Sequence, residues 1–107
     1  MKVCLIEPPK FVSLTNFVST ISMPPIGLAY IAAAIREEGH DVTVVDGPGS
    51  APRNYHLFKD EIRVRGLTRE QIIERIPYDS QVIGLGCMFT SHWVYVRELV
   101  SEIRKLF

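Results

Sequence analysis

The sequence has few cysteines, no net charge and no long hydrophobic run. Its two cysteines, Cys4 and Cys87, are too few and too far apart for a disulfide framework or a zinc site. Lys and Arg number 12, as do Asp and Glu, so overall charge does not attract nucleic acid or an anionic membrane. No stretch approaches the ~18 apolar residues of a membrane span, and the apolar run near Met1 is too short for a signal peptide. We therefore expect a cytoplasmic protein without a membrane span or nucleic-acid partner, with both cysteines reduced and buried.

Several motifs of common catalytic and nucleotide sites are also absent. The loop after the first apolar run reads EPPKF and lacks G-x-G-x-x-G, the glycines that let a backbone approach a dinucleotide pyrophosphate. The GLG at 84–86 lies inside an apolar run, and there is no G-K-[ST]. Glu7 has no second carboxylate in its loop, and the three histidines are scattered. The sequence therefore predicts no catalytic residue and no metal site.

The pattern that is present is typical of one globular α/β domain. The 107 residues are 47% hydrophobic and 22% charged, which suits a single core. Apolar runs without alternation, typical of strands covered on both faces, lie at 3–6, 42–45 and 82–87. Helical patterns follow them at 24–38, 67–76 and 91–107. This alternation predicts a doubly wound parallel sheet of three βα units with right-handed crossovers.

Local signals define the first two helices. Apolar residues at helical spacing predict a buried face made of Leu28, Ile31, Ala32 and Ile35. Gly39 predicts a left-handed cap at the end of this helix. Thr68 and Gln71 have the spacing of a capping box at the start of the next one.

The remaining segments are less regular. Residues 10–22 read as a long loop, and Ile62 and Val64 alternate with charged residues as in a short exposed strand. Ser91 is a candidate cap for the third helix. Its expected core face consists of Val96, Leu99, Val100, Ile103 and Phe107.

The doubly wound fold directs attention to the carboxyl ends of the strands, where such sheets bind ligands. Three loops lie there, at 7–23, 46–50 and 88–92. Glu7 ends the first strand and is either a ligand contact or a solvated carboxylate. Asp46 ends the second strand, where dinucleotide-binding folds place a ribose-binding acid. The missing glycine motif disfavours that role.

The third strand contributes two glycines and two hydroxyl groups to the same edge. Gly84 and Gly86 indicate close approach either of a flat ligand or of a packed helix. Thr90 and Ser91 could hydrogen-bond a polar ligand tail or cap the following helix. His92 lies at the same edge, but one histidine alone is weak support for a metal ligand.

Several segments together resemble the cobalamin-binding domain of cobalamin-dependent radical S-adenosylmethionine enzymes. They read IEPP at 6–9, MPPIGLAYIAA at 23–33, EGHDV at 38–42 and VD at 45–46. The likeness continues through residues 66–76 and through VIGLG at 82–86 with Thr90. Within that family the chain is most similar to the branch of the anaerobic magnesium-protoporphyrin monomethyl ester cyclase.

The resemblance implies a flavodoxin-like sheet of order 2-1-3-4-5 with cobalamin at its carboxyl edge. The corrin would lie over the loops and the nucleotide tail beside the first and third strands. Related mutases carry a cobalt-ligating histidine in D-x-H-x-x-G, where this chain reads EPPKFV at 7–12. The serine that relatives place at the end of the third strand is Gly86 here. The implied cofactor-binding residues are Glu7, Pro8, Pro9, Pro25, Gly27, Asp46, Gly84, Gly86, Met88, Thr90 and Ser91.

The resemblance also implies missing parts. We expect residues 1–107 to be the N-terminal portion of the cobalamin-binding domain, with strands four and five following. A radical S-adenosylmethionine domain with its [4Fe-4S] cluster is expected downstream. The chain would then be a cobalamin-binding module of a methyltransferase or oxidative cyclase, and not catalytic by itself. Two alternatives stay open: a partial α/β domain that self-associates through its open sheet edge, and another doubly wound nucleotide or flavin binder.

Overall fold

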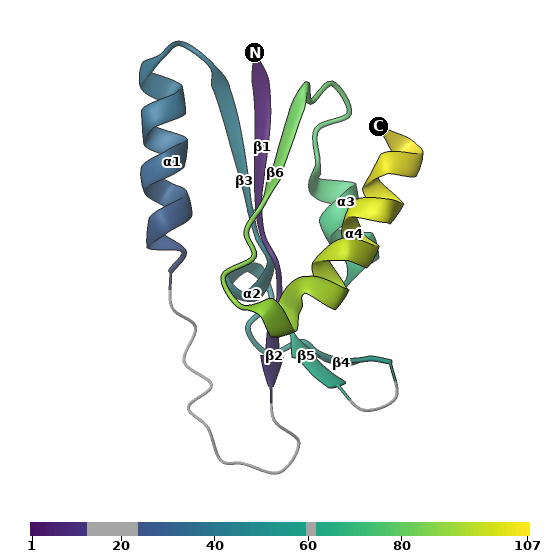
Figure 1. Ribbon diagram of the computed structural model, residues 1–107. Helices are drawn as coiled ribbons and strands as arrows, with labels where there is room; N and C mark the ends of the chain where they lie inside the picture. Colours follow the sequence, from purple (N-terminus) through teal and green to yellow (C-terminus); the bar gives the residue numbers. More distant parts are fainter. Residues whose placement is uncertain (13–23, 60–61) are drawn as a thin grey trace.

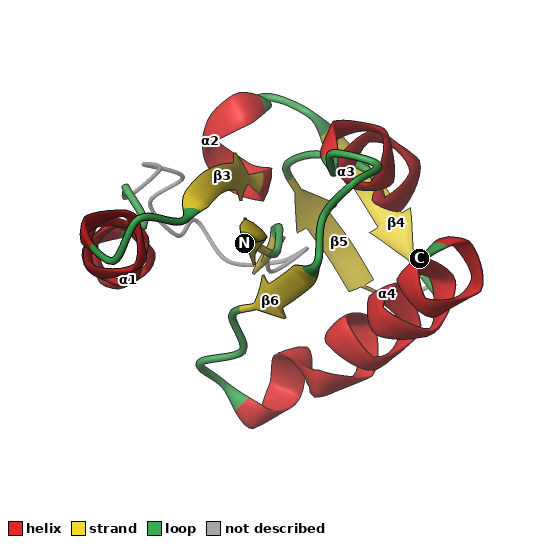
Figure 2. Cartoon of the chain, turned by 90° about the horizontal axis from the view of Figure 1, so that it is seen from above, coloured by secondary structure: helices red, strands yellow, loops and turns green. Residues whose placement is uncertain are grey.

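The computed structural model describes residues 1–12, 24–59 and 62–107. Its centre is a parallel sheet of order β3-β1-β6, formed by β3 (Asp41–Asp46), β1 (Lys2–Glu7) and β6 (Val82–Leu85). Helix α1 (Ile26–Glu37) covers one face, and α3 (Arg69–Arg75) and α4 (Trp93–Leu106) cover the other (Figures 1 and 2). The prediction of a doubly wound α/β fold is confirmed, and the arrangement is compatible with a flavodoxin-like or Rossmann-like fold.

Strand β1 is the buried centre of the sheet. Successive side chains of a strand point to opposite faces, and Val3 and Leu5 pack with Ala32 of α1. Cys4 and Ile6 belong instead to the larger core cluster on the face of α3 and α4. The apolar run without alternation therefore reflects a strand that is covered on both sides.

Helix α1 ends as its sequence predicts but buries less than expected. Gly39 has φ of 89° and its N–H donates to the carbonyl of Arg36, so the left-handed cap is confirmed. Ala32 is buried, and Leu28 and Ile35 pack beside it. Ile31 is 52% exposed, so its predicted place in the core is wrong. It lies at the margin of the face that α1 turns to the sheet.

The start of α3 follows its local signal. Thr68 accepts a hydrogen bond from the N–H of Gln71, and the Gln71 side chain accepts one from the N–H of Thr68. The capping box is therefore confirmed. Leu67 and Ile72, on either side of the cap, are both buried in the larger core cluster.

The start and end of α4 differ from prediction. A 3-10 turn over Thr90–His92 leads into the helix, and no side chain among the described residues caps it. Ser91 is therefore not the cap. Phe107 follows the last helical residue and is 42% exposed, so its predicted core position is wrong as well. Tyr95, which the prediction omitted, is buried.

A second, antiparallel sheet of order β2-β5-β4 extends beyond the carboxyl ends of the parallel strands (Figure 1). It consists of β2 (Lys10–Val12), β5 (Ile62–Arg65) and β4 (Tyr55–Phe58). The predicted loop at 10–22 is therefore wrong for its first three residues, and 13–22 lie outside the described residues. Val64 is buried, so the predicted strand is present but is not exposed there.

The turn after β3 forms a short helix, α2 (Gly47–Ser50), that packs against the end of β1. The Asp46 carboxylate accepts a hydrogen bond of 3.0 Å from the N–H of Gly49. A Cβ at Gly47 would lie 2.6 Å from the carbonyl oxygen of Glu7, so the close approach requires glycine. This contact fixes the loop after β3 beside the loop after β1.

The two cysteines are both free but differ in burial. Cys4 is buried, as predicted. Cys87 is exposed, which corrects the prediction, because β6 ends at Leu85 and Cys87 lies in the loop beyond it. In the described part of the chain, no helix has the length and apolar character needed to cross a membrane.

Candidate functional site

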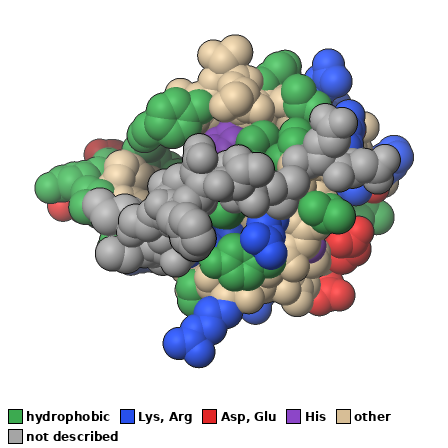
Figure 3. Space-filling model, turned by 90° about the horizontal axis from the view of Figure 1, so that it is seen from below, with side chains coloured by type: hydrophobic (Ala, Val, Ile, Leu, Met, Phe, Trp, Pro, Cys, Tyr) green, Lys and Arg blue, Asp and Glu red, His purple; other side chains and the backbone are tan. Residues whose placement is uncertain are grey.

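A pocket of about 270 Å³ lies at the carboxyl ends of β1 and β6. From β1 the chain goes to β3 on one side and later to β6 on the other, so this is where the strand order changes. Doubly wound sheets bind ligands at such a point. The pocket is lined by Glu7, Pro8, Lys10, Leu28, Ile31, Gly86, Cys87, Met88, Phe89 and His92. Figure 3 looks onto this edge, where hydrophobic side chains lie among basic ones and a histidine.

One wall of the pocket is apolar and open to solvent. Leu28 and Ile31 contribute from α1, and Met88 and Phe89 from the loop after β6. Met88 is 86% exposed and Phe89 is 58% exposed. Exposed apolar side chains gathered at a pocket mark a place where an apolar surface can bind.

The opposite wall carries an ion pair. The Lys10 ammonium lies 2.9 Å from the Glu7 carboxylate, and both groups are partly exposed. Glu7 ends β1 and Lys10 begins β2, and both residues line the pocket. The pair gives the site one acceptor and one donor without a net charge.

His92 lines the pocket as a neutral ring. Its Nε2 accepts a hydrogen bond of 3.3 Å from the N–H of Phe11, which assigns the proton to Nδ1. Burial lowers the pKa of His92, the Lys10 ammonium lowers it further, and the Glu7 carboxylate raises it. The Phe11 and His92 rings meet edge to face at 4.4 Å. His92 therefore joins the antiparallel sheet to the start of α4.

No metal centre is formed in the described residues, which contain no group of three or more His, Cys, Asp or Glu side chains suited to a metal ion. The described site offers hydrogen bonds and apolar contact.

Comparison with known proteins gives one curated relative. The chain is 47% identical over 106 residues, 98% of its length, to an uncharacterized methyltransferase of Pyrococcus horikoshii. The chain spans 19% of the length of that relative. No family model matches the chain. No solved structure matches it. The similarity thus covers nearly all of this chain, including the pocket residues, and a small part of the relative.

Four of the residues predicted for the site lie in the pocket: Glu7, Pro8, Gly86 and Met88. Gly86 allows the Glu7 carboxylate to approach the strand end closely, because a Cβ there would lie only 3.2 Å from Oε2 of Glu7. The loop ends of two neighbouring parallel strands therefore meet as the sequence predicts.

Other predicted residues have structural surroundings. A Cβ at Gly84 would lie 3.0 Å from the Leu5 side chain, so Leu5 fills the space that this glycine leaves. The Asp46 side chain caps α2. Asp46 pairs with Glu7 in the parallel sheet, so it also lies at the carboxyl edge. Pro9 is buried against Gly66.

The last four predicted residues lie outside the pocket lining. Pro25 directly precedes α1, and Gly27 is the second residue of that helix. A Cβ at Gly27 would have no other atom within 4 Å. Thr90 and Ser91 are exposed in the 3-10 turn before α4.

Six residues that line the pocket are not predicted from the sequence as site residues: Lys10, Leu28, Ile31, Cys87, Phe89 and His92. Lys10 falls in a predicted loop, because the three residues of β2 are too few to show a strand pattern. Leu28 and Ile31 belong to the apolar face that helical spacing predicts for α1. The spacing does not show which residues of that face pack on the sheet and which lie at its margin. The sequence places His92 at the correct edge, and its part in the pocket follows from its long-range contact with Phe11.

Proposed function

We propose that this chain is a cobalamin-binding module of a methyltransferase that also carries a radical S-adenosylmethionine domain. The observation that carries the proposal is the apolar pocket at the change of strand order, beside Gly86 and the end of β1. The name of the Pyrococcus relative, a methyltransferase, supports the reaction class. The segments that resemble cobalamin-binding domains include both strand ends that form the pocket.

The described residues suit one face of a corrin ring. A flat, largely apolar macrocycle can lie against Met88, Phe89 and Ile31, which are all exposed. Gly86 adds no side chain between such a ring and the strand ends. The pocket is much smaller than a cobalamin molecule, so these residues supply one wall of the site and not all of it.

The polar residues at this edge would position the cofactor without binding its cobalt. The segment at 7–12 contains no histidine, and Nε2 of His92 is already occupied by the N–H of Phe11. The Glu7 and Lys10 pair would hydrogen-bond amide groups at the rim of the corrin. Gly84 opens no slot for a nucleotide tail, because Leu5 occupies the adjacent space.

Bound cobalamin would supply a cobalt centre that carries a methyl group to the substrate carbon. The task of this chain is then to hold one face of the ring and exclude water from it. The S-adenosylmethionine site and the [4Fe-4S] cluster belong, in this proposal, to a domain downstream of this one.

A titration of hydroxocobalamin, followed by its absorbance spectrum, tests the proposal. We expect a saturable spectral change and cofactor retained on desalting. Met88→Asp should weaken binding about tenfold or more, because it places a charge against an apolar ring. Tyr78→Asp is the matched control, since Tyr78 is 91% exposed and lies outside the pocket lining. Its affinity should equal that of the unchanged chain.

Two results would overturn the proposal. One is a spectrum that does not change and a cofactor that is lost on desalting. The other is an equal loss of affinity in both variants, which would show that Met88 has no specific contact. Flavin mononucleotide, titrated in parallel, tests the alternative of another doubly wound binder and should not saturate.

A second candidate function rests on the sheet edges. Among the described residues, β3 and β6 each pair with β1 alone, so each has one unpaired edge. Val44 on β3 and Val82 on β6 are both exposed. Such edges can pair with another chain, and the chain would then act as an association module. Sedimentation equilibrium decides this: a dimer that persists at micromolar concentration supports it, and a monomer rules it out.

A further inference from the structure

A second pocket, of about 270 Å³, lies on the side of the molecule that carries α3 and α4. Its walls come from β4, the start of α3 and the first turns of α4. It shares no lining residue with the pocket at the carboxyl ends of β1 and β6. We propose that it binds a small neutral molecule through an amide group. This proposal does not depend on cobalamin binding.

The main observation is a pair of buried polar atoms that both belong to residues lining this pocket. The Tyr95 hydroxyl and Nδ1 of His56 have no hydrogen-bond partner among the described residues. Tyr95 is only 2% exposed. Proteins seldom leave buried polar atoms unpaired, because their lost hydration is then not replaced. Two such atoms at one pocket therefore indicate an occupant that hydrogen-bonds both.

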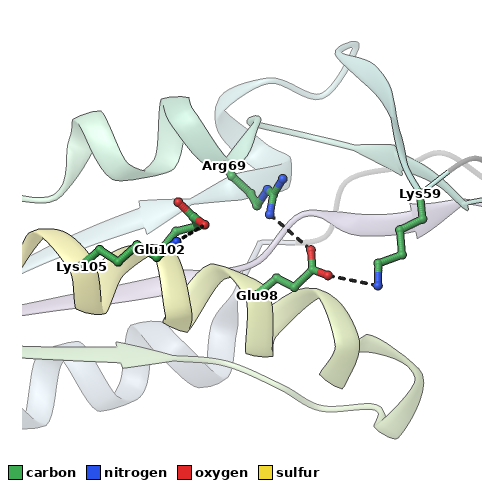
Figure 4. Close-up of polar contacts among 5 residues, drawn as sticks. All are labelled: Lys59, Arg69, Glu98, Glu102 and Lys105. Atoms are coloured by element: carbon green, nitrogen blue, oxygen red, sulfur yellow. Dashed lines mark hydrogen bonds and ion pairs between the residues drawn. The ribbon is translucent and has the colours of Figure 1, made fainter.

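The charged side chains at the rim cancel one another. Glu98 of α4 points between Arg69 of α3 and Lys59 at the end of β4 (Figure 4). Its two carboxylate oxygens lie 3.0 Å from Lys59 Nζ and 3.2 Å from a guanidinium nitrogen of Arg69. Glu70 adds a second carboxylate to the lining. Two cations and two anions leave no net charge, so the rim favours neither an anion nor a cation.

The inner groups require a ligand that both accepts and donates a hydrogen bond. Burial raises the pKa of Tyr95, so its hydroxyl keeps its proton and can donate. Burial lowers the pKa of His56, so its ring is neutral, and Nδ1 accepts when the proton is on Nε2. An amide carbonyl would accept from Tyr95 while the amide N–H donates to His56.

Two aromatic rings pack against each other beside the pocket. The Phe58 and Tyr95 rings meet at 5.0 Å and 68°. Both residues line the pocket, and the Lys59 ammonium lies 5.5 Å from the centre of the Phe58 ring. The rings are only 5% and 2% exposed, so their packing fixes the position of the Tyr95 side chain and offers little surface of its own to an occupant.

Titration of the protein with acetamide, followed by backbone ¹H–¹⁵N correlation spectra, tests this inference. We expect saturable shifts at His56 and Tyr95 with acetamide, and none with acetate or methylammonium. Tyr95→Phe removes only the hydroxyl and should weaken acetamide binding about 3- to 10-fold, the effect of one hydrogen bond. Tyr55→Phe is the control, because Tyr55 lies on the same strand as His56 but outside the pocket lining.

Three results would overturn the inference. They are shifts that do not saturate with acetamide, equal binding of acetamide and acetate, and unchanged affinity in Tyr95→Phe. The first would mean that the pocket holds ordered water only. None of them bears on cobalamin binding, which the titration of hydroxocobalamin tests separately.

Discussion

Gly47 and Gly27 show at the scale of single residues how differently two glycines constrain this chain. A Cβ at Gly47 would meet backbone atoms of Glu7 and Pro9 at 2.6 and 2.9 Å, and backbone cannot move as a side chain end can. Gly47→Ala should therefore lower the free energy of unfolding by about 1–3 kcal/mol. Gly27 lies in α1 with open space, so Gly27→Ala should raise it by up to about 1 kcal/mol.

Urea denaturation of the two variants measures both effects. Equal stability of Gly47→Ala and the unchanged chain would show that α2 does not pack closely on the end of β1. The pocket geometry would then need revision, because this contact holds the loops after β1 and β3 side by side.

His92 makes stability depend on pH. Its folded pKa is lowered, chiefly by burial, so the unfolded chain takes up the proton at higher pH than the folded one. The stabilisation is complete above about pH 6.5, the usual histidine pKa, and is lost as the pH falls through the lowered pKa. Protonation would also place a second N–H against that of Phe11.

His92→Gln separates this contribution from that of other groups. Glutamine can still accept a hydrogen bond but does not titrate. The fall in stability between about pH 7 and pH 5, measured by urea denaturation, should be smaller in this variant. An identical pH profile for both proteins would contradict the neutral His92 described here.

At the scale of elements, the start of α3 depends on a local cap. Thr68→Ala removes the oxygen that accepts the N–H of Gln71 and should cost about 1 kcal/mol in unfolding free energy. Thr90→Ala is the matched control, because Thr90 begins the 3-10 turn and caps no helix. Thermal or urea unfolding compares the two, and equal losses would mean that the capping box contributes nothing specific.

The elements of the parallel sheet could be predicted because their signals are local. β1 is an apolar run, Gly39 ends α1 and Thr68 begins α3. In the antiparallel sheet, alternation at Ile62 and Val64 predicts β5. The sequence does not predict β2, because that strand is stabilised by pairing across more than 50 residues, as between Lys10 and Arg65. Three residues carry too little periodicity to identify a strand.

The residues of the pocket could be predicted only in part. Glu7 and Gly86 could be predicted to lie together, because each follows or ends a parallel strand and the carboxyl ends of such strands meet at one edge of the sheet. The contribution of α1 could not be derived, because it depends on how the helix lies across the sheet. Nor could the role of His92, which requires Phe11 to be in β2.

At the scale of the whole molecule, exposed large apolar side chains occur on several surfaces, and one group of them lies around the pocket at the carboxyl edge. Tyr30 and Ile31 of α1 are exposed, as are Met88, Phe89 and Trp93 near the start of α4. Ile31, Met88 and Phe89 line the pocket at the carboxyl ends of β1 and β6, and Tyr30 and Trp93 are sequence neighbours of lining residues. Apolar surfaces gathered in this way indicate a binding face, which agrees with the proposed contact with a corrin ring.

The most direct test of the central claim is to map hydroxocobalamin onto the protein by ¹H–¹⁵N chemical shifts. The account predicts perturbations concentrated at the carboxyl edge, at Glu7, Gly86, Cys87 and Phe89. Residues at the opposite, amino edge of the sheet, such as Arg36 and Asp79, should be unaffected. Shifts that gather at the amino edge, or no shifts at saturating cofactor, would contradict a cobalamin site at the ends of β1 and β6.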